Sequence, residues 1–216
     1  MRKVYTVKRV RFADVDTEGF WESIPAAALT ERPWEEFTYH PETNARLVMS
    51  EKGFHLLMTS RESFLRAEET NLNAGVCEDS CMEFFFMPAP EKSKSYVNIE
   101  MNPKGVYHCG MGTGRHERWF PSTEANRCLN IKAGTETGKV ECVETEQLWW
   151  VRYDLPWVYL DSLFGKDTYE SGKVMRGNFY KCGDSTVHVH YNTWSGIGLP
   201  KPDYHCPDWF GELVIE

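Results

Sequence analysis

The segment YVNIEMNPKGVYHCGMG, residues 96–112, contains two candidate strands, one on each side of a turn. In the first run Val97, Ile99 and Met101 alternate with polar residues. A period of two is typical of a strand with one face in a core and the other toward solvent or a ligand. The Asn-Pro-Lys-Gly sequence at 102–105 predicts a tight turn. The segment therefore predicts an antiparallel hairpin.

Short alternating or apolar runs, separated by Gly, Pro, Asn and Asp, recur along the whole chain. They predict further strands at 5–12, 45–50, 54–61, 82–88, 128–134, 147–155, 173–182, 186–194 and 210–216. Turn sequences at 51–53 and 182–185 predict two more hairpins. The pattern indicates an all-β fold, an antiparallel β-sandwich of the jelly-roll or immunoglobulin-like kind.

Helical signals are few. Pro156 predicts a short helix over 157–164, since proline favours the start of a helix, and 24–29 is a second candidate. The sequence contains no repeat and no linker rich in Pro, Ser or Gly. We therefore expect a single domain over residues 1–216.

Composition excludes some classes of partner. The formal net charge of −8 argues against a nucleic-acid backbone or an anionic membrane, since both require clustered Lys and Arg. No apolar run approaches the roughly 18 residues of a membrane span. The first 20 residues lack the apolar region of a signal peptide, which predicts a cytoplasmic protein unless a leader is missing from this sequence. The seven scattered cysteines are expected to be free thiols.

Polar residues alternate through the strands on both sides of the 182–185 turn. A three-residue loop would place Tyr180 opposite His188 and Asn178 opposite His190. This register predicts a continuous polar wall that ends in an aromatic ring, formed by Arg176, Asn178, Tyr180, His188, His190 and Trp194.

Such a wall suits a sugar. The C–H faces of a pyranose pack on aromatic rings, and its hydroxyls require donors and acceptors of the kind that Arg, Asn, Glu and His supply. Asn98 and Glu100, on the polar face of the 96–102 strand, are further candidates for such contacts. The alternative is a set of ordinary solvated strand residues with Trp194 half buried.

Three carboxylates gather near the start of the 82–88 strand. Glu78 and Asp79 could bind calcium through their oxygens, although no EF-hand spacing is present. Asp79 could equally accept hydrogen bonds from turn amides. Glu83 begins a buried strand, so it requires a partner, either an arginine or a ligand hydroxyl.

Several segments in order resemble the carbohydrate-binding module family 9-like domains. They are CEDSCMEFFFMP (77–88), YVNIEMNPKG (96–105), DLPWVYL (154–160), RGNFYKCGDSTVHVHYNTWS (176–195) and PDYHCPDWFGELVI (202–215). The resemblance covers the chain from about Ala45 to its end. It implies a DOMON-like β-sandwich with a sugar site on one face, bound calcium, and association with glycoside hydrolases such as xylanases.

The resemblance also implies roles for single residues. Two tryptophans clamp the saccharide in the best-known members, and by motif position Trp194 is similar to one of them. Glu83 is similar to a polar ligand-binding residue, and Arg176 and Asn178 lie in the matching strand. The loop NLNAGVCE (71–78) has no aromatic where the second ring is expected. Trp119 is the candidate replacement, with Arg115 beside it in a glycine-rich loop.

The predicted function is non-catalytic binding of a β-linked plant polysaccharide fragment, such as a xylo- or cello-oligosaccharide from xylan or cellulose. One alternative is a glycoside hydrolase that uses Glu83 and Glu100 as its carboxylate pair. Another is a metal-dependent enzyme centred on His188 and His190. A haem-binding role, known in some DOMON-like proteins, is a third.

Overall fold

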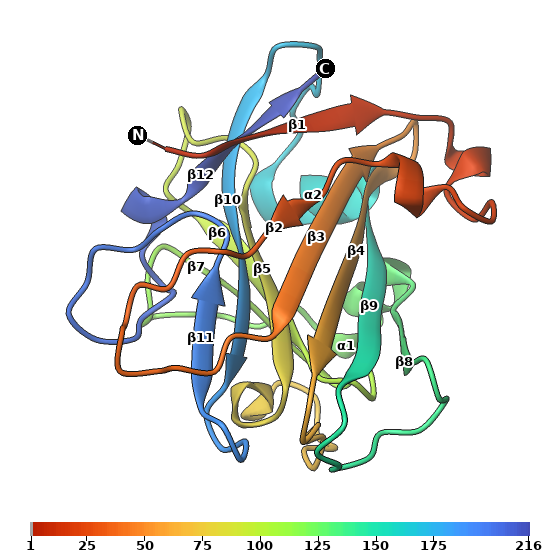
Figure 1. Cartoon of the computed structure of the whole chain (residues 1–216). Coiled ribbons are helices and arrows are strands. Elements are labelled where there is room, and N and C mark those ends of the chain that lie inside the picture. Colours follow the sequence, from red (N-terminus) through yellow and green to blue (C-terminus); the bar gives the residue numbers. More distant parts are fainter. Residues whose placement is uncertain (1) are drawn as a thin grey trace.

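The computed structural model describes residues 2–216, which form a β-sandwich of two facing sheets (Figure 1). The first, here called sheet A, has the order β7–β6–β5–β10–β12–β1, and β11 also pairs with β10. Its strands are β1 (Val4–Arg9), β5 (Cys81–Met87), β6 (Tyr96–Met101), β7 (Tyr107–Gly112), β10 (Val174–Gly183), β11 (His190–Thr193) and β12 (Gly211–Ile215).

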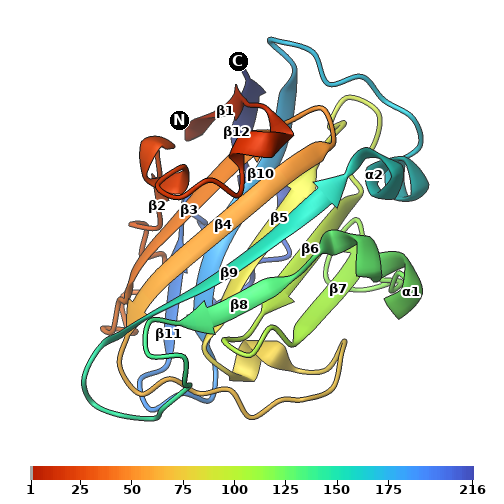
Figure 2. The same ribbon diagram turned by 90° about the vertical axis from the view of Figure 1, so that its right-hand side faces the viewer.

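The second sheet, here called sheet B, has the order β2–β3–β4–β9–β8 (Figure 2). Its strands are β2 (Ala27–Ala28), β3 (Glu42–Met49), β4 (Gly53–Glu62), β8 (Lys132–Thr135) and β9 (Gln147–Pro156). The sequence therefore predicted the β-sandwich correctly.

Strand β1 connects the two sheets at one end of the sandwich (Figure 1). Val4–Val7 pair with β12, and Lys8 and Arg9 pair with β3; both pairings are parallel. The fold is therefore mixed, whereas the sequence predicted antiparallel pairing throughout. The difference arises because turn residues predict local hairpins but carry no signal for pairing between the two ends of a chain.

The core lies between the sheets. Phe84 and Phe86 of sheet A face Phe54 and Trp149 of sheet B, and all four side chains are buried. Alternate residues of each strand point inward, as the period of two predicted. Burial of these side chains stabilises the fold by about 1.5–3 kcal/mol each before entropic costs.

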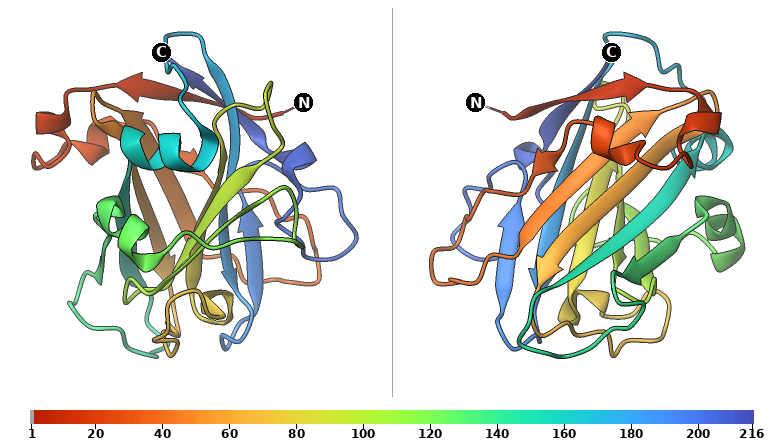
Figure 3. Two further views of the ribbon diagram at one scale, coloured as in Figure 1. Left: turned by 180° about the vertical axis from the view of Figure 1, so that it is seen from behind. Right: turned by 45° about the vertical axis from the view of Figure 1, so that its right-hand side comes forward.

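Helices are short, and they close the side of the sandwich next to β7 and β9 (Figure 3). The helix α2 (Trp157–Phe164) follows Pro156 as predicted, and it meets α1 (Thr123–Asn126) where the Tyr159 hydroxyl donates to Asn126 at 2.8 Å. Residues 24–29 do not form the predicted helix, because they contain β2. The 3₁₀ turns are Phe12–Asp14, Trp21–Ser23, Val76–Glu78, Arg127–Leu129 and Pro207–Trp209.

None of the helices among residues 2–216 has the length and apolar character required to cross a membrane.

Two of the three predicted hairpins form at the expected turns, between β3 and β4 and between β6 and β7. The third differs, because β10 continues to Gly183 and β11 begins only at His190. Tyr180 lies opposite Thr193 rather than His188, a shift of five positions. An odd shift reverses the face on which every side chain of the second strand lies.

Candidate functional site

A hollow of about 450 Å³ opens on the outer face of sheet A, and we call it the sheet A pocket. Glu83, Glu100 and Cys182 form its floor, and β5, β6 and β10 supply them. Tyr191 of β11 and His205 of the loop before β12 form parts of its wall. The volume lies within the range of about 300–1,000 Å³ that is common for small-molecule pockets.

The floor is a pair of buried carboxyl groups. Glu83 and Glu100 are directly paired across β5 and β6. The Cys182 thiol donates to Glu83 Oε1 at 3.0 Å, and Asn98 Nδ2 donates to Glu100 Oε1 at 2.7 Å. Burial, followed by repulsion from Glu100, raises the pKa of Glu83 well above its usual value. Burial also raises the pKa of Glu100, so the pair can both donate to and accept from ligand hydroxyls.

An arginine and an aspartate in an ion pair form another part of the pocket wall. Arg115 forms a salt bridge with Asp203 at 2.8 Å, and both residues line the pocket. Arg118 lies behind this pair, where its guanidinium donates to Asn98 and covers the ring of Tyr96 at 4.7 Å from the centroid. An Arg side chain beside carboxyl groups provides planar N–H donors, from which sugar hydroxyls can accept hydrogen bonds.

Aromatic rings complete the wall. Tyr204 lines the pocket and stacks on Tyr180 with ring centroids 4.0 Å apart. His205 Nδ1 shares a hydrogen bond of 2.8 Å with the Tyr96 hydroxyl. Burial, followed by the positive charge of Arg118, lowers the pKa of His205 to about 3, so the ring is neutral near pH 7. Tyr191 offers the partly exposed ring on which a sugar can pack.

Three predicted ligand-binding residues, Glu83, Glu100 and Arg115, line the pocket. Asn98 supports the floor through its bond to Glu100, and Tyr180 lies beneath Tyr204.

Two others lie outside the pocket. Asn178 bonds the backbone of Ser195 through both of its side-chain polar atoms. Arg176 lies further along β10, opposite Met87 and Glu212. Neither residue is among those that line the pocket.

Trp194 does not form the predicted platform. Its side chain is only 5% exposed and packs edge-on against Tyr5 and at a tilt against Phe179 inside the core. A Cβ added at Gly211 would come within 2.4 Å of the indole, so the backbone contacts the ring directly. The shifted register of β11 is the reason, because it turns Trp194 inward and places Tyr191 on the outer face.

His188 and His190 do not form a joint site. His190 is buried, and its Nε2 lies 2.6 Å from Lys181 Nζ. Its Nδ1 donates to the carbonyl of His188 at 2.7 Å, which leaves Nε2 to accept from Lys181. Burial, followed by the Lys181 charge, lowers the pKa of His190 well below its usual value. The His188 side chain lies in an exposed loop beside Tyr39 and Phe64.

Trp119 is 49% exposed and pairs through its backbone with Met111. Trp119 is not among the residues that line the sheet A pocket, so it does not supply the predicted second clamp ring of this pocket. Sequence reasoning missed Tyr191, Tyr204, His205 and Asp184 as lining residues. A six-residue loop after Gly183 would have revealed Tyr191, because that register places it on the same face as Cys182.

The predicted calcium ligands have other partners. Asp79 is buried, and its carboxylate accepts from the backbone amides of Glu68 and Glu69 and from Asn102 Nδ2. Glu78 is exposed. Among residues 2–216 the two carboxylates do not belong to a shared group of three or more ligands. These residues do not fit a calcium cage, and calcium binding stays a prediction.

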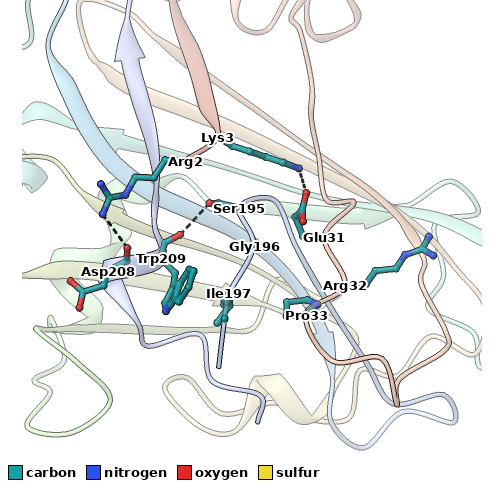
Figure 4. Close-up of a pocket in the computed structure, with 11 residues that line it drawn as sticks. Arg2, Lys3, Glu31, Arg32, Pro33, Ser195, Gly196, Ile197, Asp208 and Trp209 are labelled. Atoms are coloured by element: carbon teal, nitrogen blue, oxygen red, sulfur yellow. Dashed lines mark hydrogen bonds and ion pairs between the residues drawn. The ribbon is translucent and has the colours of Figure 1, made fainter. Parts of the chain in front are cut away.

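A second hollow, of about 640 Å³, lies beside Trp209, whose ring is 42% exposed (Figure 4). Two of its charged side chains have partners here: Lys3 forms an ion pair with Glu31 at 2.7 Å, and Arg2 donates to the carbonyl of Asp208 at 3.2 Å. The sheet A pocket instead holds buried carboxyl groups without an ion-pair partner in the described chain. The sheet A pocket is therefore the stronger candidate for a site that binds hydroxyls.

Burial of the Glu83 carboxyl group should cost the folded protein stability when this group is ionised. We expect Glu83→Gln to raise the free energy of unfolding at pH 8 by about 0.5–2 kcal/mol, the usual gain when a functional strain is removed. Because the pKa of Glu83 is raised in the folded state, the stability that protonated Glu83 contributes is fully present below the unfolded pKa of 4.5. That stability is lost as pH rises, so wild type falls behind the variant only at higher pH. The gain should therefore vanish near pH 4 in urea unfolding. An equal gain at both pH values would contradict the assignment.

Comparison with known proteins places this geometry in context. A carbohydrate-binding protein, provisionally described as such, from Bacteroides uniformis ATCC 8492 is 29% identical, with a TM-score of 0.84 and full coverage of both chains. A family 9 carbohydrate-binding module from Caldicellulosiruptor kristjanssonii with cellotriose is 10% identical, with a TM-score of 0.64 over 99% of this chain and 94% of that one. A family 9 module from the same organism with glucose is also 10% identical, with a TM-score of 0.62 over 99% of this chain and 96% of that one.

Among curated proteins no significant match was found. The sequence model of carbohydrate-binding family 9 matches residues 19–215, which is nearly the whole chain. The protein therefore belongs to carbohydrate-binding family 9.

Proposed function

We propose that this protein binds a saccharide in the sheet A pocket without cleaving it. The observation that supports this most directly is the buried Glu83–Glu100 pair opposite Arg115, beside the ring of Tyr191. These groups offer the donors, acceptors and apolar face that a pyranose requires. The cellotriose and glucose found with two structural relatives make cello-oligosaccharides the first ligands to test. Xylo-oligosaccharides are the second.

The floor favours binding over glycoside hydrolysis. Glycosidases require one ionised carboxylate and one protonated carboxyl group, so their environments must push the two pKa values apart. Here burial raises the pKa of both Glu83 and Glu100. A shift of both pKa values in the same direction does not provide the separate acid and nucleophile of a glycosidase, and the pair instead supplies hydrogen bonds to ligand hydroxyls. An incubation with cello-oligosaccharides should therefore release no new reducing ends.

A chain of Ser50, His55 and Asp154 has the order of a hydrolase triad. Ser50 Oγ lies 2.8 Å from His55 Nε2, and His55 Nδ1 lies 2.6 Å from Asp154 Oδ1. Ser50 is only 4% exposed, and its Oγ also accepts from the backbone amide of Lys52. These contacts fix the β3–β4 turn against β9, which is a structural role.

Calorimetric titration with glucose, cellobiose, cellotriose and xylobiose tests the proposal. We expect saturable binding, and we expect Tyr191→Ala and Arg115→Ala each to weaken it by about tenfold or more, equivalent to about 1.4 kcal/mol. Trp209→Ala is the matched control, because its exposed ring lies in the second hollow. Affinity lost in Trp209→Ala but kept in Tyr191→Ala would move the site there, and no heat with any sugar would overturn the proposal.

A further inference from the structure

The floor of the sheet A pocket also brings together two thiols and a carboxyl group. Cys81 and Cys182 are directly paired across β5 and β10, and Glu83 lies two residues further along the same face of β5. One ligand atom from each of Cys81, Glu83 and Cys182 lies within 4.8 Å of the other two. All three residues are buried, and both cysteines are free.

Two members of this group line the pocket, and none of the three carries a positive charge. Glu83 and Cys182 line the pocket, so an ion can approach from solvent. Glu83 forms no ion pair within residues 2–216, and the hydrogen bond that it accepts from a side chain is the one from the Cys182 thiol. A buried carboxyl group beside two thiols is costly unless a cation or a hydrogen-bonding ligand satisfies it.

The donor set determines which ion fits. Thiolates select Zn²⁺ and other soft or borderline ions over Ca²⁺ and Mg²⁺, which prefer oxygen ligands alone. Zinc takes ligands at about 2.3 Å from sulfur and about 2.0–2.2 Å from oxygen, so donors spaced within 4.8 Å can close around one ion with small side-chain movements. Three protein ligands leave a fourth position directed into the pocket.

We propose that Cys81, Glu83 and Cys182 form a binding site for a thiophilic divalent ion such as Zn²⁺, with its fourth position open to the sheet A pocket. The site goes beyond saccharide binding and does not depend on it. A bound ion would lie on the floor that the saccharide is proposed to contact, so metal and sugar would compete for Glu83 or share the ion through a hydroxyl.

Titration of the reduced full chain with Cd²⁺ tests the site, because thiolate binding to Cd²⁺ gives an ultraviolet charge-transfer band. We expect one equivalent to saturate the band and Zn²⁺ to displace it. The Cys81→Ser/Cys182→Ser double variant should lose the band. Cys142→Ser, at an exposed cysteine, should keep it. Glu83→Gln should weaken binding by about tenfold or more, since even outer-shell partners contribute about 10–100-fold.

No saturable band in the wild type, or a band that survives in the double variant, would overturn the metal site. Near-ultraviolet circular dichroism shows whether each variant is folded, and Glu83→Gln provides a test in which both cysteines remain. Saccharide affinity measured in the presence of a chelator separates the two proposals. Sugar binding with no Cd²⁺ band rejects the metal alone, and a Cd²⁺ band with no sugar binding rejects the saccharide site alone.

Discussion

Replacement of Lys181 by Met should lower the free energy of unfolding by about 3–5 kcal/mol, the cost of breaking a buried ion pair by removing one partner. Lys181 lies on the inner face of β10, and its Nζ is 3.0 Å from Glu62 Oε2. Both side chains are buried between the sheets. Without Lys181, Glu62 would remain as a buried carboxylate whose charge has no compensation, and urea unfolding would measure the loss.

Other hydrogen bonds hold both Glu62 and Lys181 in the core, so the Glu62 carboxylate would stay buried in the variant. Glu62 also accepts from Trp149 Nε1 at 3.0 Å and from the Ser80 hydroxyl at 2.8 Å. Lys181 also donates to the carbonyl of Cys182 at 2.9 Å and to His190. Each partner comes from a different strand or loop, so the cluster joins both sheets at one end of the core.

Two variants serve as controls. Lys3→Met removes a surface pair with Glu31, which is expected to contribute about 1 kcal/mol or less. The double variant Lys181→Met/Glu62→Gln removes both charges, so it should lose clearly less than the sum of the two single variants. A loss for Lys181→Met no greater than that for Lys3→Met, or strict additivity in the double variant, would contradict a buried charged pair.

The sequence predicted most strands because apolar residues at every second position mark a half-buried strand. It failed where that pattern carries no information. The alternation places Lys181 on the same face as the core residues Met175 and Phe179, but it does not show what would neutralise a lysine there. Its partner Glu62 is more than 100 positions away in the sequence, at the end of β4. Such a pair becomes visible only when the two sheets are placed face to face.

The site depended on register. Glu83, Glu100 and Arg115 were predicted and line the pocket. Glu100 followed from the alternation of the 96–102 strand, Glu83 from its place in a buried strand, and Arg115 from a glycine-rich loop. The β10–β11 loop was predicted to have three residues, and the structure has six, 184–189. This one error exchanged Tyr191, which lines the pocket, for Trp194, which does not. Loop length is the weakest part of hairpin prediction when Gly, Asp and Ser occur together.

Because the observed register places Trp194 in the core, its replacement should have the second large effect on stability. We expect Trp194→Ala to lower the free energy of unfolding by about 3–5 kcal/mol, the range for a buried Trp or Phe replaced by Ala. Tyr5 and Phe179 pack edge-on or tilted against the indole, and Gly211 leaves no side chain to fill the space behind it. The cavity would therefore stay unfilled.

Saccharide affinity distinguishes this packing role from a binding platform. In the folded fraction of Trp194→Ala, calorimetry below the melting temperature should give the wild-type dissociation constant, because the ring lies in the core and not in the sheet A pocket. Trp209→Ala removes an exposed indole and should cost little stability, about 0.5 kcal/mol or less. Unchanged stability of Trp194→Ala together with lost sugar binding would show that the ring faces a ligand in solution.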